Sequence, residues 1–202
     1  MVAARDLPRF TPQEYLAWEE QQPERYEYFD GEVYAMTGGT LPHADIALNI
    51  ATAIKPHLTG SCKVRNSDAK VAISEAGPFT YPDVSVSCDD RDRIAKQYIQ
   101  FPCLIIEVLS PSTEAYDRGG KFRLYRNLDS LQEYGLVSSD LKSIELFRRN
   151  ASGIWEYTSY SEGETFTLTS IGLTLAVDAL YEDVILETPI DASIVESDRD
   201  RS

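Results

Sequence analysis

The sequence predicts an α/β fold in which helices pack on one mixed β-sheet. Its central part reads as a helix, three strands, a second helix and a fourth strand, in that order. Consecutive strands can pair antiparallel, whereas the strand after the second helix can return parallel through a right-handed crossover. A chain of 202 residues is long enough to bury the core of one such domain.

A helix and a hairpin are expected before this core. Thr11 and Glu14 can form the capping box of a helix that runs to Trp18, with a proline at its first position. Two strand-like segments then flank an Asp-Gly pair, which is a strong signal for a two-residue hairpin turn. These segments are residues 26–29 and 32–36, around Asp30-Gly31.

The core elements follow from hydrophobic periodicity. Ile46, Ile50 and Ile54 recur at helical spacing, and a proline at position 56 would bend or truncate that helix. The segment 68–73 alternates, as in a strand with one face in water. The expected core elements are a helix at 44–58, strands at 63–74, 81–88 and 104–109, a helix at 113–128 and a strand at 134–137.

A β meander is expected to close the domain. Its expected elements are strands at 143–149, 154–160, 166–168 and 172–175 and a short helix at 178–181. The domain is therefore expected to span residues 1–187. The acidic, mostly polar segment 188–202 is expected to be a disordered tail.

The charge and the hydropathy of the chain limit its function. A net charge of −14 argues against a general nucleic-acid coat protein, because phosphate binding needs clustered Lys and Arg, although a local basic cluster lies at 118–126. No stretch approaches the roughly 20 apolar residues of a membrane span. The first residues lack the apolar core of a secretion signal. We therefore expect a cytoplasmic protein without a membrane partner.

The cysteines and tyrosines both receive a structural interpretation. Cys62, Cys88 and Cys103 lack the paired spacing of a zinc site, and the last two fall in or beside apolar strands. We expect them to be reduced and to act as small hydrophobes, and no disulfide is predicted. The 12 tyrosines are interpreted as half-buried sheet residues rather than as a base-stacking platform.

Two carboxylates on neighbouring apolar strands are the strongest functional signal. Asp83 follows a proline near the start of one strand, and Glu107 interrupts the apolar run 103–109. A strand of that kind buries both faces, so an ionised carboxylate in it is costly unless it is paired or binds a metal. Lys121 lies 14 residues further on, in the second expected core helix. Two carboxylates and a lysine at one sheet edge are typical of hydrolysis with a divalent metal ion.

These residues and the order of elements resemble the PD-(D/E)XK nuclease superfamily, and more closely the Uma-two family of putative restriction endonucleases. The resemblance runs from about residue 10 to residue 185 and implies a restriction-endonuclease-like core. It rests on Thr11-Pro12-Gln13-Glu14-Tyr15, Glu27-Tyr28-Phe29-Asp30-Gly31-Glu32, Tyr81-Pro82-Asp83-Val84 and Ile106-Glu107-Val108-Leu109-Ser110-Pro111-Ser112-Thr113.

The resemblance implies a metal-dependent DNA endonuclease. The resemblance also implies that Asp83 and Glu107 bind Mg²⁺ (or Mn²⁺), aided by the backbone carbonyl of Val108. The implication is chemically consistent, because a hard cation prefers oxygen ligands and retains waters, one of which can attack a phosphodiester.

The sequence departs from the superfamily pattern at the lysine. The usual lysine lies two residues after the acid, and that position holds Leu109. Lys121, on the following helix, is the candidate replacement as the catalytic lysine. Asp117 and Tyr125 are spaced by four from Lys121 and share its helix stripe, so both are accessory site candidates.

The site residues also have structural interpretations. Asp83 could cap backbone N–H groups at a strand end. Lys121 could form a buried ion pair with Glu107, or could be a solvated helix residue. His43 and Glu27 are accessory candidates, but we favour a helix cap at residue 44 for His43 and a cross-strand contact on the hairpin surface for Glu27.

Three functions remain open on these residues. The first is a Mg²⁺-dependent endonuclease that acts on DNA as a homodimer, because cutting both strands of a duplex needs two sites and two-fold pairs are the commonest oligomers. The second is a catalytically silent binding or scaffolding module with the same fold. The third is a hydrolase that uses the same carboxylates on a small phosphoester.

Overall fold

The centre of the molecule is a six-stranded mixed sheet. The computed structural model describes residues 8–36, 38–111 and 113–186. The strand order of the sheet is β10 (Trp155–Ser161), β9 (Ser143–Arg149), β8 (Glu133–Ser138), β7 (Pro102–Leu109), β6 (Val84–Ser87) and β3 (Lys63–Asn66). Strands β6 and β7 pair antiparallel, and β7 and β8 pair parallel. The expected α/β fold and its crossover are therefore confirmed.

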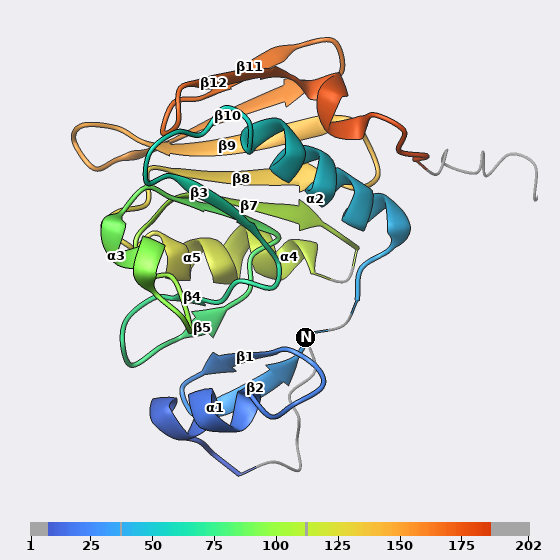
Figure 1. Cartoon of the computed structure of the whole chain (residues 1–202). Coiled ribbons are helices and arrows are strands. Elements are labelled where there is room, and N and C mark those ends of the chain that lie inside the picture. Colours follow the sequence, from blue (N-terminus) through green and yellow to red (C-terminus); the bar gives the residue numbers. More distant parts are fainter. Residues whose placement is uncertain (1–7, 37, 112, 187–202) are drawn as a thin grey trace, which may run out of the picture.

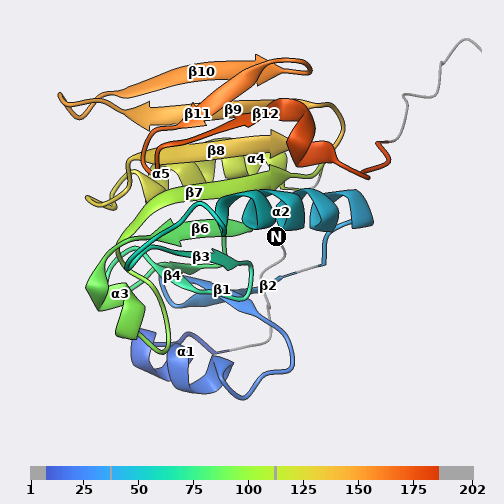
Figure 2. The ribbon, with the colours of Figure 1, turned by 45° about the horizontal axis from the view of Figure 1, so that its top comes forward.

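Helices cover both faces of this sheet. Helix α2 (Leu41–Ile54) lies on one face (Figure 1, Figure 2). The crossover between β7 and β8 lies on the other face. It consists of α4 (Glu114–Tyr116), a π-helical turn η1 (Asp117–Lys121) and α5 (Phe122–Tyr125).

A smaller sheet is built mainly by the N-terminal part of the chain. Its order is β2 (Glu32–Ala35), β1 (Tyr26–Phe29), β5 (Phe79–Thr80) and β4 (Val71–Ala72). Helix α1 (Pro12–Glu19) begins with the expected capping box at Thr11 and packs its Tyr15 against Tyr28 and Phe79. Asp30-Gly31 forms the expected turn, with both residues at positive φ.

The C-terminal strands lie at the opposite end of the molecule from α1 (Figure 1). After β9 and β10, which pair along their whole length, the chain forms the hairpin of β11 (Thr165–Leu168) and β12 (Leu173–Ala176). A 3₁₀ helix η2 (Val177–Tyr181) follows and packs near α2. The expected tail at 188–202 lies outside the described residues.

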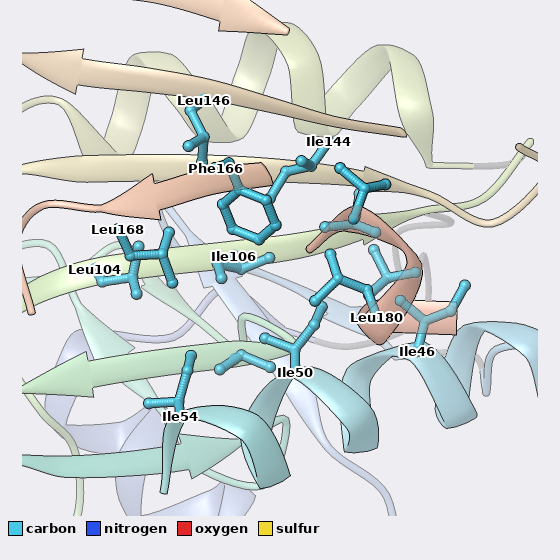
Figure 3. Close-up of a cluster of buried hydrophobic side chains, with 14 of the residues drawn as sticks. Ile46, Ile50, Ile54, Leu104, Ile106, Ile144, Leu146, Phe166, Leu168 and Leu180 are labelled. Carbon is cyan, nitrogen blue, oxygen red and sulfur yellow. The ribbon is translucent and has the colours of Figure 1, made fainter. Parts of the chain in front are cut away.

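The main core lies between α2, the large sheet and the β11–β12 hairpin. Ile46, Ile50 and Ile54 of α2 face Leu104 and Ile106 of β7, and the side chains of β11 close the cluster (Figure 3). A second cluster fills the opposite face of the sheet, around Ile105, Leu109, Tyr125 and Tyr134. Residues of β7 therefore alternate between two cores, as expected for a strand that is buried on both faces.

Some expected elements differ from the structure. The strand expected at 63–74 is broken by a turn at 67–69, so that β3 joins the large sheet and β4 the small one. The helix expected at 113–128 is interrupted by η1 and ends at Tyr125. Helix α3 (Asp90–Ile94) and strand β5 are present although no pattern predicted them. In the described ranges, no helix is both long and apolar enough to span a bilayer.

The expectation for the cysteines was wrong in part. Cys62 and Cys88 form a disulfide, whereas Cys103 is free and buried. The physical reason is the pairing of β3 with β6, in which Lys63 lies opposite Ser87. Continuing this register by one residue brings Cys62 next to Cys88, a proximity that their sequence separation of 26 does not indicate.

Glu133 connects the large sheet to the β11–β12 hairpin. Its side chain is fully buried at the start of β8 and accepts hydrogen bonds from Arg148 Nε (2.8 Å), Thr169 N (3.0 Å) and Ser170 N (2.7 Å). Burial alone would raise the pKa of Glu133, but the hydrogen bonds from Ser170, Arg148 and Thr169 outweigh it and lower the pKa. The ionised form is therefore the form that stabilises the fold.

We expect Glu133→Gln to lower the free energy of unfolding at pH 7 by about 2–3 kcal/mol, because the buried donors lose a charged acceptor. Since the folded-state pKa is depressed, this stability is present above the unfolded pKa and is lost as pH falls through the folded pKa. The difference from the native protein should therefore shrink below about pH 4.5. Urea denaturation of both proteins across this pH range measures the difference in their free energies of unfolding.

Glu156→Gln is the matched control for this experiment. Glu156 is exposed on β10, so its substitution should change stability by less than about 0.5 kcal/mol. An equal loss in the two variants, or a Glu133→Gln difference that grows in acid, would contradict the role of the buried carboxylate.

Candidate active site

Asp83 and Glu107 face each other across two paired strands. Val84 lies opposite Ile106 in the β6–β7 ladder, so that Asp83 precedes β6 beside Glu107. Asp83 N donates to Glu107 Oε2 at 3.4 Å, and Val108 N donates to Asp83 Oδ2 at 2.8 Å. Asp83 therefore does cap a backbone N–H group, and it still lies next to Glu107.

The strand pleat explains the direction of Glu107. Its neighbours Ile106 and Val108 point into the core beneath α2, whereas Glu107 shares the other face with Ile105 and Leu109. On that face, the Tyr125 hydroxyl donates to Glu107 Oε1 at 2.8 Å. The side chain of Glu107 is only 2% exposed, and burial raises its pKa well above its ordinary value. Lys121 opposes this rise, and nearby carboxylates add to it.

Lys121 lies in the middle of the acidic side chains. Its Nζ is 3.1 Å from Glu107 Oε1, 3.3 Å from Asp117 Oδ1 and 3.8 Å from Glu27 Oε1. The residue is 8% exposed, so the interpretation as a solvated helix residue was wrong, and the buried ion pair with Glu107 is present. Burial alone would lower the pKa of Lys121, but the carboxylates outweigh it and raise the pKa well above its ordinary value.

A π-helical turn positions Lys121 and Asp117. Both residues are buried and belong to η1, in which Gly119 and Gly120 provide the backbone. A Cβ atom on Gly120 would lie 2.5 Å from the ring of Tyr116, a distance that real contacts do not reach. Glycine at this position therefore lets the Tyr116 ring pack directly on the turn that carries Lys121.

Glu27 lies in the site and not on the hairpin surface. Its side chain is 2% exposed, and its Oε1 accepts a hydrogen bond from Tyr81 N at 3.1 Å. It thus holds the segment that leads into Asp83 and also faces Lys121. The predicted surface position was wrong because the η1 turn, with Lys121, covers this face of β1.

His43 also lies in the site and is not the helix cap. Helix α2 begins at Leu41, and Thr40 caps it by accepting a hydrogen bond from His43 N at 3.4 Å. The His43 ring is thereby free for the site, where Nε2 is 3.3 Å from Asp83 Oδ2. Burial alone would lower the pKa of His43, but Asp83 and the Val108 carbonyl raise it.

Carboxylates outnumber cations at this site. In the described part of the chain, Glu27, Asp83, Glu107 and Asp117 gather around the ammonium of Lys121, with His43 beside Asp83. Such an excess of negative charge favours the approach of a further cation or proton. No preformed group of three or more His, Cys, Asp or Glu ligands occurs among the described residues. The oxygens of Asp83, Glu107 and Val108 could nevertheless hold a hard cation together with waters, since Mg²⁺ sites often use only one or two carboxylates.

The site opens into a cavity of about 500 Å³. Asp83, Glu107 and Lys121 line one part of it, and the turn between β3 and β4 lines another. Sequence reasoning missed a further wall, which is the face of α2 with small residues at helical spacing: Ala44, Ala47 and Ala51. That spacing was visible in the sequence and is the signal that could have indicated a groove.

Comparisons with known proteins identify the family and the fold of the chain. The family model described as "Putative restriction endonuclease" (Uma2) matches residues 12–178, which is more than half of the chain. A protein of Synechocystis sp. described as uncharacterised is 51% identical over 176 residues, covering 87% of this chain and 93% of the relative. A second uncharacterised Synechocystis protein is 30% identical over 164 residues, covering 78% of this chain and 91% of the relative.

A solved structure shares the fold. The crystal structure of a protein from Anabaena variabilis, described as a putative nuclease belonging to DUF820, matches with a TM-score of 0.69 at 18% identity. The match covers 87% of this chain and 99% of that one. The fold and the family model together support a nuclease. The chain belongs to the Uma2 family of putative restriction endonucleases.

Proposed function

We propose that the protein is a metal-dependent endonuclease that hydrolyses phosphodiester bonds of DNA at the Asp83–Glu107 pair. The observation that carries the proposal is the convergence of these two carboxylates, from adjacent strands, with the Lys121 ammonium 3.1 Å from Glu107. The cavity of about 500 Å³ gives a substrate access to the group. The family model supports nucleic acid as the substrate.

Mg²⁺ or Mn²⁺ fits the donor atoms of the site. Asp83 and Glu107 would hold the ion with carboxylate oxygens, and Val108 would add its backbone carbonyl. All of these are hard oxygen donors, which match the preference of Mg²⁺. When bound, the ion would lower the pKa of a coordinated water and offset the charge of the phosphate.

Lys121 would stabilise negative charge in the transition state. Its raised pKa keeps the side chain protonated at neutral pH, so it serves as a cation and a hydrogen-bond donor and not as a base. The buried setting strengthens this effect, because charges interact more strongly where water is excluded. The short distance between its Nζ and Glu107 Oε1 supports Lys121 as the replacement for the usual lysine of the superfamily.

Three further residues would position this group. The Tyr125 hydroxyl, whose pKa burial raises, stays protonated and fixes Glu107. Glu27 holds the backbone of Tyr81, two residues before Asp83, and faces Lys121. His43 contacts Asp83 Oδ2, which restrains that carboxylate beside β7.

A catalytically silent binding module is the second candidate function. The observation that favours it is the ion pair between Lys121 and Glu107, which partly neutralises the site without any metal. A net charge of −14 also disfavours contact with the phosphates of DNA. Wild-type protein that binds Mn²⁺ but cleaves no DNA with either ion would select this alternative.

We expect Asp83→Asn and Glu107→Gln each to weaken Mg²⁺ or Mn²⁺ binding by at least roughly 10- to 100-fold, a range typical even of changes to outer-sphere partners. Neither variant should unfold, since removing one charge relieves repulsion among the carboxylates of the apoprotein. Calorimetric titration measures the affinity. Glu32→Gln, on the exposed part of the hairpin, is the control, and unchanged affinity in both site variants would reject the shared metal site.

Lys121→Met should reduce the rate of plasmid nicking roughly a hundred- to a thousandfold while metal affinity is kept, because one charge contact to the transition state is lost. Lys142→Met is the matched control. Lys142 also bridges two carboxylates, Glu162 and Asp178, but its side chain is 33% exposed. Circular dichroism at the assay temperature checks that each variant is folded. Nicking by Lys121→Met at the native rate would exclude the catalytic role.

We also propose that the active form is a symmetric homodimer, since cleavage of both strands of a duplex requires two active sites. Light scattering over a range of concentrations should give about twice the mass of the 22.7 kDa chain. A constant mass of one chain at all concentrations would exclude this assembly.

A further inference from the structure

We propose that a second cavity, beside the η1 turn, binds a nucleobase whose phosphate contacts Arg123. The cavity has a volume of about 520 Å³ and is lined by Phe29, Tyr34, Tyr116, Gly120, Arg123 and Leu124. None of these residues lines the first cavity, although Tyr116 and Gly120 shape the turn that carries Lys121. The inference rests on the proposed function in so far as the nucleobase belongs to a nucleic-acid substrate.

Strand β1 and the crossover helix each contribute residues to both the carboxylate site and this cavity. On β1, Phe29 follows Glu27 by two residues and therefore points to the same side of the strand. Along the crossover helix, Tyr116, Gly120 and Leu124 recur every four residues, and Gly120 precedes Lys121 directly. A ligand in the cavity would thus lie against Gly120, the residue that directly precedes the buried Lys121.

Aromatic rings form the cavity walls at nearly right angles. The Phe29 ring centroid is 5.6 Å from that of Tyr34 with an interplanar angle of 75°, and 6.1 Å from that of Tyr116 with an angle of 89°. The Tyr116 ring is held against Gly120, where any side chain would collide with it. Phe29, Tyr34 and Tyr116 are each half-buried, and together they give the cavity an aromatic lining that suits a flat aromatic ligand.

Arg123 adds a guanidinium to the cavity and forms no ion pair with the residues that the structure describes. Within the described residues, no carboxylate lies within 4.0 Å of its guanidinium, whereas the nearby Arg118 binds both Glu114 and Glu145. Glu32, which accepts a hydrogen bond from the Tyr34 hydroxyl, is paired with Arg9 at 2.9 Å. The local charge therefore favours an anionic ligand.

These properties together select a nucleotide. Stacking of a base on an aromatic side chain contributes about 1–3 kcal/mol and requires no particular base. A guanidinium matches the geometry of phosphate oxygens. The cavity volume lies in the range of small-ligand sites, which is about 300–1,000 Å³. Either a base of a single-stranded segment or a free mononucleotide has this chemistry.

The test is calorimetric titration with adenosine monophosphate and with a single-stranded oligodeoxyadenylate, both in EDTA so that no metal contributes. We expect native protein to bind at least the oligonucleotide. Tyr34→Leu should weaken binding by about tenfold or more, which is the loss of one stacking contact. Tyr34→Phe, which keeps the ring, should bind as the native protein does, and Arg123→Gln should weaken binding and its dependence on salt.

Two controls make the experiment specific. Tyr157→Leu changes a tyrosine that is 56% exposed on β10, and it should leave binding unchanged. Lys142→Met, which changes a cation that does not line the cavity, should also leave binding unchanged. Thermal melting checks that each variant is folded.

The outcomes separate the possible occupants. Binding of both probes identifies the cavity as a nucleotide site in general, and binding of the oligonucleotide alone identifies it as a subsite for the strand. No binding of either probe, or native binding by Tyr34→Leu, overturns the proposal. The proposal is also overturned if Tyr34→Leu dissociates a dimer of the protein but still binds nucleotide. In that case the cavity would hold a second copy of the chain.

Failure of this proposal is distinguishable from failure of the nuclease function. DNA cleavage without binding at the cavity rejects the cavity alone. Binding at the cavity by a protein that cleaves no DNA rejects the endonuclease activity and keeps the nucleotide site.

Discussion

The buried ammonium of Lys121 is the interaction on which the rest of the site depends. Without a cation at this position, Glu27, Glu107 and Asp117 would bring like charges together in an environment that stabilises charge poorly. The lysine holds these groups from three parts of the chain: the hairpin, strand β7 and the η1 turn. It therefore couples the small N-terminal sheet to the large one. In the proposed mechanism, the same charge would stabilise a phosphate in the transition state.

Strand β7 supplies the second constraint. Because it is buried on both faces, its side chains alternate between the core under α2 and the core under α5. Glu107 interrupts the second of these cores, where Tyr125 and Lys121 contact its Oε1 and Asp83 N donates to its Oε2. The parallel pairing with β8 requires a crossover, and that crossover brings Lys121 back over β7. Fold topology and site geometry thus follow from one connection.

Local sequence patterns were reliable where one short-range interaction dominates. The capping box at Thr11, the Asp-Gly hairpin and the extent of β9 agree with the structure, since each depends on neighbouring residues. The proline at position 56 was also informative, because α2 ends at Ile54. The errors came from contacts distant in sequence. Cys62 and Cys88 meet only through the register of β3 and β6, and His43 reaches Asp83 only because Thr40 takes over the cap.

The sequence by itself determined the mixed α/β class, the order of its elements and the identities of Asp83, Glu107 and Lys121 as the residues of interest. Periodicity and turn chemistry are local, and an acid within an apolar strand is conspicuous without any structure. Only the tertiary structure decided how these groups meet: that Glu27 is buried beside Lys121, that a π-helical turn carries the lysine, and that aromatic residues from β1, β2 and the crossover enclose a cavity. Those facts depend on packing between segments roughly 90 residues apart, which no local pattern encodes.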